Sequence, residues 1–492
     1  MNEHKEGNQL IWKISENYKY FGGLSLAYGL IFTFCLYKNM SGITFPICVV
    51  ATIVFAVQFM KKIHYQLRKY SYPYIIGMVL LGISTAFTTS FFLHFFNLIG
   101  IVLLFFVFMI HQFYNDSVWN FPAYLKRICI LFGTMLQCIP YPYQHGAGYL
   151  NKNKDQKNNS TLVAVAIGFL VAIGILSVIL PLLLKSDAIF SRLFGEILRY
   201  INFGTILGIC LTFIVGFTLC YAFFSALCKY NFPEGRERKM RYYHPVIGIT
   251  FTSIVSVIYL VYCTIQIMYL FIGMQSGLPE NMTYAQYARG GFWELLFVSI
   301  INFVMVLLCM HIFPENRILK IILTVISGCT FIMIFSAGYR MFLYIGAYHL
   351  TFLRILVLWF LIVLTMIMSG VIVNIYKRQF PLFHYIMAVV SVLYIGFSFS
   401  RPDTIITRYN IAHSENMEEQ DIYYLLYHTS WDAAPEIAKI NLEDYEWDTE
   451  WIEEDIRSYF RHIEEESEGI YFRKANYSRI MAKKAAEEYL NK

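Results

Sequence analysis

Hydrophobic residues in this chain occur in long continuous blocks, not at the spacing of a half-buried helix or strand. Two such blocks are residues 162–184, which contain no charged residue, and residues 352–375, which contain one. Both exceed the roughly 18 apolar residues that a helix needs to cross the hydrocarbon core of a bilayer. The pattern therefore predicts an all-α fold, a bundle of helices that crosses a membrane several times.

The same pattern along the whole chain predicts about eleven spanning helices. Their approximate bounds are residues 20–37, 43–60, 73–91, 95–113, 161–184, 203–228, 245–272, 291–313, 318–338, 352–376 and 381–399. Aromatic residues gather at the ends of these blocks, as interfacial belts require; examples are Tyr18, Tyr37, Tyr70 and Trp293. We expect the bundle to occupy residues 20–400.

Lysine and arginine mark alternate connections between the blocks. They are concentrated in residues 61–72, 114–160, 229–244, 317–320 and 377–378. Because these residues accumulate on the cytoplasmic side of membrane proteins, we expect these connections and residues 1–19 to be cytoplasmic. An odd number of spans then places residues 401–492 on the extracytoplasmic side.

Charge separates the predicted bundle from the C-terminal residues. Residues 401–492 contain 11 Lys and Arg against 21 Asp and Glu, a net charge of −10. The preceding residues contain 28 against 12, a net charge of +16. Membrane topology accounts for this positive charge, so the sequence gives no reason to expect a nucleic-acid partner.

Two segments outside the spans are expected at the membrane surface. Residues 128–142 contain an apolar stretch that is too short to span and is followed by Pro140 and Pro142, so we place them against the inner face. Residues 186–201 have one apolar and one charged face. That pattern suits a helix in the headgroup plane or one packed on the bundle.

Residues 401–492 are expected to form a small acidic helical domain that leans on the bundle, because about 90 residues bury little core of their own. Thr449 and Gly469 suit the start and end of one of its helices. Ser430 and Asp432 suit the first turn of an earlier helix, where Pro435 is tolerated.

Cysteines and catalytic motifs give no evidence of a metal site or cofactor. All ten cysteines lie in or beside apolar blocks and none forms a CxxC pair, which indicates packing residues. The chain contains no HExxH, GxSxG or GxxxxGKS/T motif. We predict no catalytic residue, metal ligand or cofactor, although a membrane enzyme with scattered polar residues would also lack such motifs.

Three charged residues near the predicted outer face need an explanation, because charge within a membrane is costly. Glu294, Arg340 and Arg354 lie near the ends of three successive spans. We expect Glu294 to pair with one arginine and hold the helices together, since the guanidinium fork suits a carboxylate. Two alternatives are that the arginines bind an anionic headgroup or solute, and that Glu294 gates a proton-coupled change.

Four motifs together resemble one family of bacterial membrane proteins. In residues 278–295 the motif YAR-x-GF-x-EL comprises Tyr287, Ala288, Arg289, Gly291, Phe292, Glu294 and Leu295. In residues 336–354 the second motif includes Arg340, Met341, Tyr344, Tyr348, Leu350, Thr351 and Arg354, with His349 where glycine is expected. Residues 401–412 and 424–437 carry the other two. Over residues 185–440 the chain is similar to the uncharacterised proteins called domain of unknown function 4173, with their relative 4153.

This resemblance implies a bacterial inner-membrane protein without implying an activity. The motif residues cluster in two predicted outer connections, the helices that follow them and the start of the acidic domain. They define a candidate polar cluster that binds a ligand or supports the structure: Tyr287, Arg289, Glu294, Arg340, Tyr344, Tyr348, Arg354, Arg408 and Asn410. A cavity roofed by the acidic domain agrees with this placement.

Three functions agree with the sequence. A sensor or accessory subunit would bind an envelope ligand, or another membrane or envelope protein, through the acidic domain and outer connections, with membrane lipids around its bundle. A transporter or lipid-handling protein would use an outward cavity near Glu294, Arg340 and Arg354, but no inverted repeat or pair of broken helices is evident. A membrane enzyme would act on a lipid-linked substrate. We prefer the first.

Overall fold

The computed structural model confirms the all-α fold. It describes residues 12–114, 119, 121–152, 203–229, 243–268, 284–413, 419–442, 450–468 and 472–491, with short stretches between 168 and 186. These residues form helices and connections, with no strand among them. The side chains of residues 284–290 lie outside this description, as does the predicted surface segment 186–201 except for its first residue.

Helices long and apolar enough to span a membrane confirm a multi-pass membrane protein. Among the described residues they number nine. They are α2 (Tyr18–Leu36), α3 (Thr44–Lys62), α5 (Phe91–Phe113), α10 (Phe203–Lys229), α11 (Pro245–Gln266), α12 (Tyr284–Ile312), α13 (Arg317–Tyr348), α14 (Phe352–Tyr376) and α15 (Leu382–Phe399). Each of these nine corresponds to one of the predicted spans.

The other two predicted spans have different outcomes. The span predicted at 73–91 is the shorter helix α4 (Tyr72–Thr85), because a turn at residues 86–90 separates it from α5. Its 14 residues extend about 21 Å, which is less than the thickness of a hydrocarbon core. The span predicted at 161–184 lies mostly outside the described residues.

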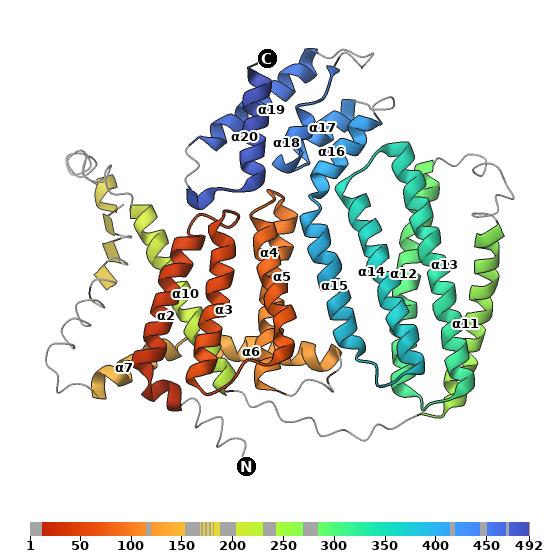
Figure 1. The fold of residues 1–492 in the computed structure, drawn as a ribbon, viewed down its shortest axis with the longest axis horizontal. Helices are drawn as coiled ribbons and strands as arrows, with labels where there is room; N and C mark the ends of the chain where they lie inside the picture. The colour runs from red at the N-terminus through yellow and green to blue at the C-terminus, as the bar shows by residue number, and fades with distance from the viewer. Residues whose placement is uncertain are drawn as a thin grey trace.

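The spanning helices form two groups, and α15 lies between them (Figure 1). One apolar core joins α2, α3, α4, α5 and α10, and two others join α11, α12, α13 and α14. Helix α15 packs against α4 on one side and against α14 on the other. Few side chains of α15 are fully buried, so hydrogen bonds contribute much of its attachment to the two helix groups.

Asn97 of α5 is the centre of these polar contacts. Its side chain is fully buried, and its amide donates to the Thr85 hydroxyl at 3.1 Å. Its carbonyl oxygen accepts from Tyr394 at 3.0 Å and from Ser398 at 2.9 Å, both on α15. On the other side of α15, the Trp359 indole donates to the Leu393 carbonyl at 3.0 Å. Interhelical hydrogen bonds of this kind help to hold membrane helices together, because apolar side chains gain little when they move from lipid to a helix interface.

Two helices cross one end of the bundle. Helix α6 (Phe121–Gln137) runs across the ends of its neighbours and continues into α7 (Tyr141–Lys152) after the break at Pro140 (Figure 1). This is the segment that the sequence places at a membrane surface. We call this end the basic side, because Lys61, Lys62 and Lys377 lie at helix ends there.

The opposite end carries the C-terminal layer, which we define as described residues 402–491 (Figure 1). Its helices are α16 (Pro402–Ala412), α17 (Glu419–Tyr427), α18 (Ala434–Ile437), α19 (Glu450–Ser467) and α20 (Tyr477–Leu490). The predicted cap Thr449 and terminator Gly469 lie outside the described residues. Ile452, Ile456 and Phe460 of α19 are at most 1% exposed and face α20, so this layer has apolar packing of its own.

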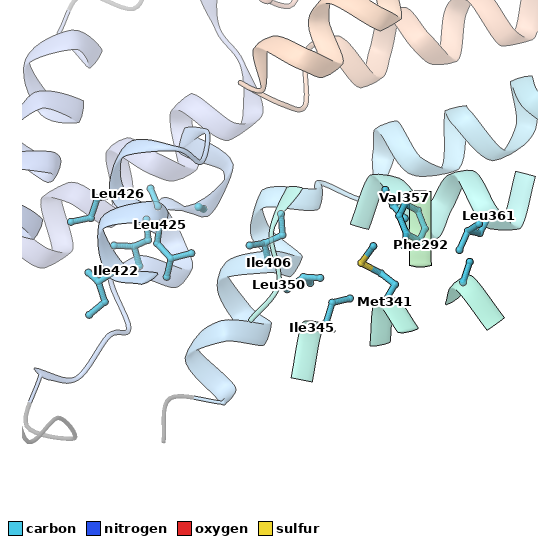
Figure 2. Packing of buried hydrophobic residues seen from close by; sticks show 14 of the residues in the cluster. Phe292, Met341, Ile345, Leu350, Val357, Leu361, Ile406, Ile422, Leu425 and Leu426 are labelled. Carbon is cyan, nitrogen blue, oxygen red and sulfur yellow. The ribbon is translucent and has the colours of Figure 1, made fainter. Parts of the chain in front are cut away.

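The core of the second helix group continues into the C-terminal layer. Figure 2 shows Leu350, in the turn after α13, between Ile345 of α13 and Ile406 of α16. Ile422 and Leu425 of α17 belong to the same buried cluster. The layer and this helix group therefore share one hydrophobic core.

The contact around Asn97 predicts a measurable coupling between α5 and α15. In a double-mutant cycle, Asn97→Ala and Tyr394→Phe should be non-additive by about 0.6 kcal/mol in the free energy of unfolding, the average for such bonds in membranes. Unfolding of the purified chain in mixed micelles provides the measurement. Asn302→Ala is the control, because Asn302 bonds to Tyr259 and Thr330 instead. The cycle of Asn302→Ala with Tyr394→Phe should be additive. Additivity of Asn97→Ala with Tyr394→Phe would contradict the contact between these two residues.

Candidate functional site

Three turns of the bundle lie under the C-terminal layer and hydrogen-bond to it. They connect α2 to α3, α4 to α5, and α13 to α14. A helix end leaves backbone N–H and C=O groups without partners inside the helix. Where a turn is covered by other residues, water reaches these groups poorly, so the covering residues have to supply hydrogen bonds.

Asn410 of α16 binds the turn between α13 and α14. Its side-chain oxygen accepts from the Leu350 N–H at 2.8 Å, and its amide donates to the Leu350 carbonyl at 3.0 Å. Both Asn410 and Leu350 are buried. Two residues later, the Phe352 N–H donates to the Tyr424 hydroxyl of α17 at 2.9 Å. An amide is the side chain that offers a donor and an acceptor at this spacing.

His349 holds this turn in a backbone conformation that usually requires glycine. Its φ of 61° and ψ of 177° lie in a region that side chains with a Cβ rarely adopt. The expectation of glycine at this position thus has a structural basis. The side chain is 10% exposed, and its Nε2 lies 3.5 Å from the Asp421 carboxylate of α17.

Arg354 caps the C-terminal end of α13. Its guanidinium donates to the carbonyls of Tyr348 and His349 and stacks on the Tyr344 ring, 4.2 Å from the ring centre. A cation is favourable there because the last carbonyls of a helix carry partial negative charge. The predicted residues Tyr344, Tyr348 and Arg354 are therefore brought together, in a helix cap and not in an ion pair.

The expected pairing of Glu294 with an arginine is wrong. Glu294 is exposed, and among the described residues it forms no ion pair with Arg340 or Arg354. The Arg340 guanidinium instead packs against Gly291, where a Cβ would overlap it. The sequence sets how far along a helix each charge lies, but it leaves open which face of the helix carries it. Glu294 is exposed, whereas Arg340 is half-buried.

The remaining predicted residues separate into two sets. Tyr287 and Arg289 belong to the first turns of α12, and their side chains lie outside the described residues. Arg408 pairs within the C-terminal layer, where its Nη2 lies 2.6 Å from the Glu436 carboxylate. Lys439 binds the other oxygen of that carboxylate at 2.8 Å. Arg408 thus braces α16 against α18 and does not join the cluster in the bundle.

Asp432 binds the turn between α4 and α5, a role that the sequence did not reveal. Its side chain is completely buried and accepts from the Thr88 hydroxyl at 2.5 Å, the Thr89 N–H at 2.7 Å and the Thr89 hydroxyl at 2.8 Å. The sequence suggested only that Asp432 lies in the first turn of a helix. A 3-10 helix does include it, but its carboxylate is directed to residues 343 positions earlier.

Asn476 at the start of α20 joins two turns at once. Its amide donates to the carbonyls of Ser41 at 2.7 Å and Thr88 at 2.9 Å, while its oxygen caps α20. Arg473 donates to the Phe34 and Tyr37 carbonyls at 3.1 and 2.6 Å, which caps the end of α2. No local motif distinguishes these residues from solvated polar residues, so no sequence signal identified them.

Two carboxylates of the C-terminal layer respond to pH in opposite ways. Asp403 is 4% exposed, and burial raises the pKa of its carboxyl to about 6, assisted by the nearby Asp432 carboxylate and opposed by hydrogen bonds from Ser430. For Glu436, burial also opposes ionisation, but the hydrogen bonds from Lys439 and Arg408 outweigh it and lower the pKa.

The backbone at His349 predicts that glycine is more stable than alanine at this position, the reverse of the usual order in a helix. His349→Gly should be more stable than His349→Ala by about 1 kcal/mol, because only glycine adopts this conformation without strain. At the nearby helical position, Ala347→Gly should instead destabilise by about 1 kcal/mol. Unfolding of the purified variants in mixed micelles measures both differences. Equal or greater stability of His349→Ala would contradict the strained turn.

Asp403 and Glu436 predict pH dependences of opposite sign. The folded pKa of Asp403 exceeds its ordinary value of 3.8, so its contribution to stability is complete below that value and is lost as the pH rises through about 6. From pH 4 to pH 7, Asp403→Asn should therefore gain up to about 3 kcal/mol relative to wild type.

For Glu436 the sign reverses, because a lowered pKa contributes stability that is lost as the pH falls. As the pH rises from 4 to 7, the free energy of unfolding of Glu436→Gln should therefore fall relative to that of wild type. Melting temperatures at several pH values provide the comparison. Parallel profiles for the two variants would refute the assignment.

The comparisons with known proteins identify one family. Residues 75–440 match the family described as Domain of unknown function (DUF4153), which is one of the two related families that the motifs resemble. The match begins well before the predicted limit at residue 185 and includes α4 through α18. The searches of curated proteins and of solved structures returned no match. Because the matched region covers most of the sequence, the chain belongs to the DUF4153 family.

Proposed function

We propose that this protein is a sensor or accessory subunit that acts at the outer face of a bacterial plasma membrane. Its basic side would face the cytoplasm and its C-terminal layer the exterior. The charge distribution supports this orientation, because Lys61, Lys62 and Lys377 lie at the end of the bundle opposite the layer (Figure 1).

The observation that carries the proposal is that the C-terminal layer binds turns of both helix groups. Arg473, Asn476 and Asp432 hold turns of the first group, and Asn410 and Tyr424 hold a turn of the second. A partner or ligand that moved the layer would therefore alter the ends of both groups together. Such a shared element is what coupling between an outer surface and a membrane bundle requires.

The exposed surface of α19 suits a protein partner. Its residues Ile452, Ile456 and Phe460 are buried, which leaves an outer face rich in carboxylates. Glu453 and Glu454 are 53% and 64% exposed and are balanced only in part by Arg457 and Arg461. A negatively charged surface of this kind favours a basic partner and increases the rate of encounter with it.

The alternative function, transport or lipid handling through a cavity near Glu294, has less support. Glu294 is exposed on α12 and forms no ion pair with either arginine among the described residues. A cavity of about 420 Å³ in the described part is lined by residues of α2, α10 and the C-terminal layer instead.

Thiol labelling of intact cells tests the orientation. The C-terminal residues contain no cysteine, so Lys484→Cys in a Cys129→Ser background provides one exposed thiol on α20. A membrane-impermeant maleimide should label it in whole cells. Lys61→Cys on the basic side should be labelled only after permeabilisation. The reverse result would overturn the proposed orientation.

Site-specific crosslinking in cells tests the accessory role. A photo-reactive amino acid at Glu454 should form an adduct with one protein, and reversing the charge of Glu453 and Glu465 to lysine should abolish it. The same amino acid at Val257, 61% exposed on α11, is the control and should crosslink to lipid. If no exposed position on α19 gives a charge-dependent adduct in cells that label Lys484→Cys, the accessory role is wrong.

A further inference from the structure

A groove of about 420 Å³ lies between α2 and α10. Leu30, Thr33, Phe34 and Tyr37 form one wall, at the spacing of one face of α2. The opposite wall comes from α10: Ile209, Cys210, Phe213 and Ile214. From Leu30 to Tyr37 the groove follows α2 for about 10 Å, towards the C-terminal layer. Leu30 and Phe34 are 64% and 59% exposed, so the groove opens on the outer surface of the bundle.

Close helix packing fixes the shape of this groove. Where α10 approaches the end of α2, the Tyr37 ring lies on Gly208, and a Cβ there would be 2.7 Å from the ring. Further along, the Phe32 ring lies on Gly216, where a Cβ would be 2.8 Å away. Glycines at these positions hold the two backbones close together, so the space between the side chains is built into the helix pair.

A cation closes the groove at the layer side. Arg473 is the one lining residue from the C-terminal layer, and two of its N–H groups bind the Phe34 and Tyr37 carbonyls. Neither Arg473 nor the neighbouring Lys38 forms an ion pair among the described residues. The Tyr37 hydroxyl is buried without a hydrogen-bond partner within the same part of the chain. Positive charge is unusual here, because the C-terminal residues as a whole are acidic.

We propose that this groove binds one anionic phospholipid from the leaflet on the layer side. An acyl chain would lie along Leu30, Phe34 and Ile209, where the wall is apolar. The phosphate would meet Arg473, whose guanidinium retains free N–H groups after capping α2. Lys38 would add a second cation at headgroup level. Lipid is the occupant that the chemistry selects, because the groove joins an apolar surface to an unneutralised cation at a helix end.

Lipid binding there would connect three elements that are distant in sequence. The ligand would contact α2, α10 and the residue that caps α2 from the C-terminal layer. Its headgroup would compensate the charge of Arg473 without displacing the bonds to Phe34 and Tyr37. Bound anionic lipid should therefore stabilise the attachment of the layer to the first helix group.

The experiment compares lipid binding by full-length variants purified in mild detergent. Dioleoyl-phosphatidylglycerol is titrated against dioleoyl-phosphatidylcholine, and bound lipid is counted by native mass spectrometry alongside melting temperature. Wild type should bind one phosphatidylglycerol and melt at a higher temperature with it than with phosphatidylcholine. Arg473→Gln keeps a donor for the α2 carbonyls but removes the charge, and should bind phosphatidylglycerol about tenfold more weakly.

Two further variants separate the groove from general effects on folding. Cys210→Trp fills the groove and should prevent stoichiometric binding of either lipid, while Arg473 stays in place. Arg457→Gln on α19 and Val257→Trp on α11 make the same changes elsewhere and should behave as wild type. Soluble glycerol phosphate should not raise the melting temperature. Unchanged lipid preference in Arg473→Gln, or unchanged binding in Cys210→Trp, would overturn the proposal.

Discussion

The structure depends on hydrogen bonds from C-terminal side chains to the backbone at the ends of membrane helices. A spanning helix satisfies its own backbone except at its ends, where water normally completes the bonds. In this protein the C-terminal layer covers three such ends, and its side chains take the place of water. Asn410 at Leu350, Asp432 at Thr89 and Asn476 at Thr88 are the clearest cases. Removing the Asn410 side chain would take away both of its hydrogen bonds to the buried Leu350 backbone, and a buried backbone group left unpaired costs more than the bond itself contributes.

This arrangement explains how two helix groups with separate cores form one molecule. Within the bundle, α15 joins them through Asn97, Tyr394 and Trp359. At the layer side, the C-terminal helices join them a second time. The contacts differ in kind: the layer shares an apolar core with α13 and α14, but it meets the first group through hydrogen bonds to two turns and the stacking of Tyr477 on Phe87. The attachment to the first group is therefore more sensitive to charge than the attachment to the second.

The sequence predicts the bundle well because membrane helices have a strong and simple signature. Apolar blocks located nine helices, and the short block within residues 128–142 belongs mostly to α6, which crosses one end of the bundle (Figure 1). The candidate site was harder to predict, because depth in a membrane does not determine which face of a helix a residue occupies. Glu294, Arg340 and Arg354 lie near the same side of the bundle yet form separate contacts. Asp432 and Asn476 were missed because their partners lie hundreds of residues away, in turns that look ordinary in sequence.

The capping of α2 by Arg473 has a consequence for biosynthesis. The amide of Asn39, in the turn after α2, also donates to the Arg473 carbonyl, and these two residues are 434 positions apart. Helices α2 and α3 therefore emerge from the ribosome long before the residues that complete the end of α2. During this interval the turn after α2 has to rely on solvent or on other factors. The end of α2 is thus synthesised well before it can reach its final structure.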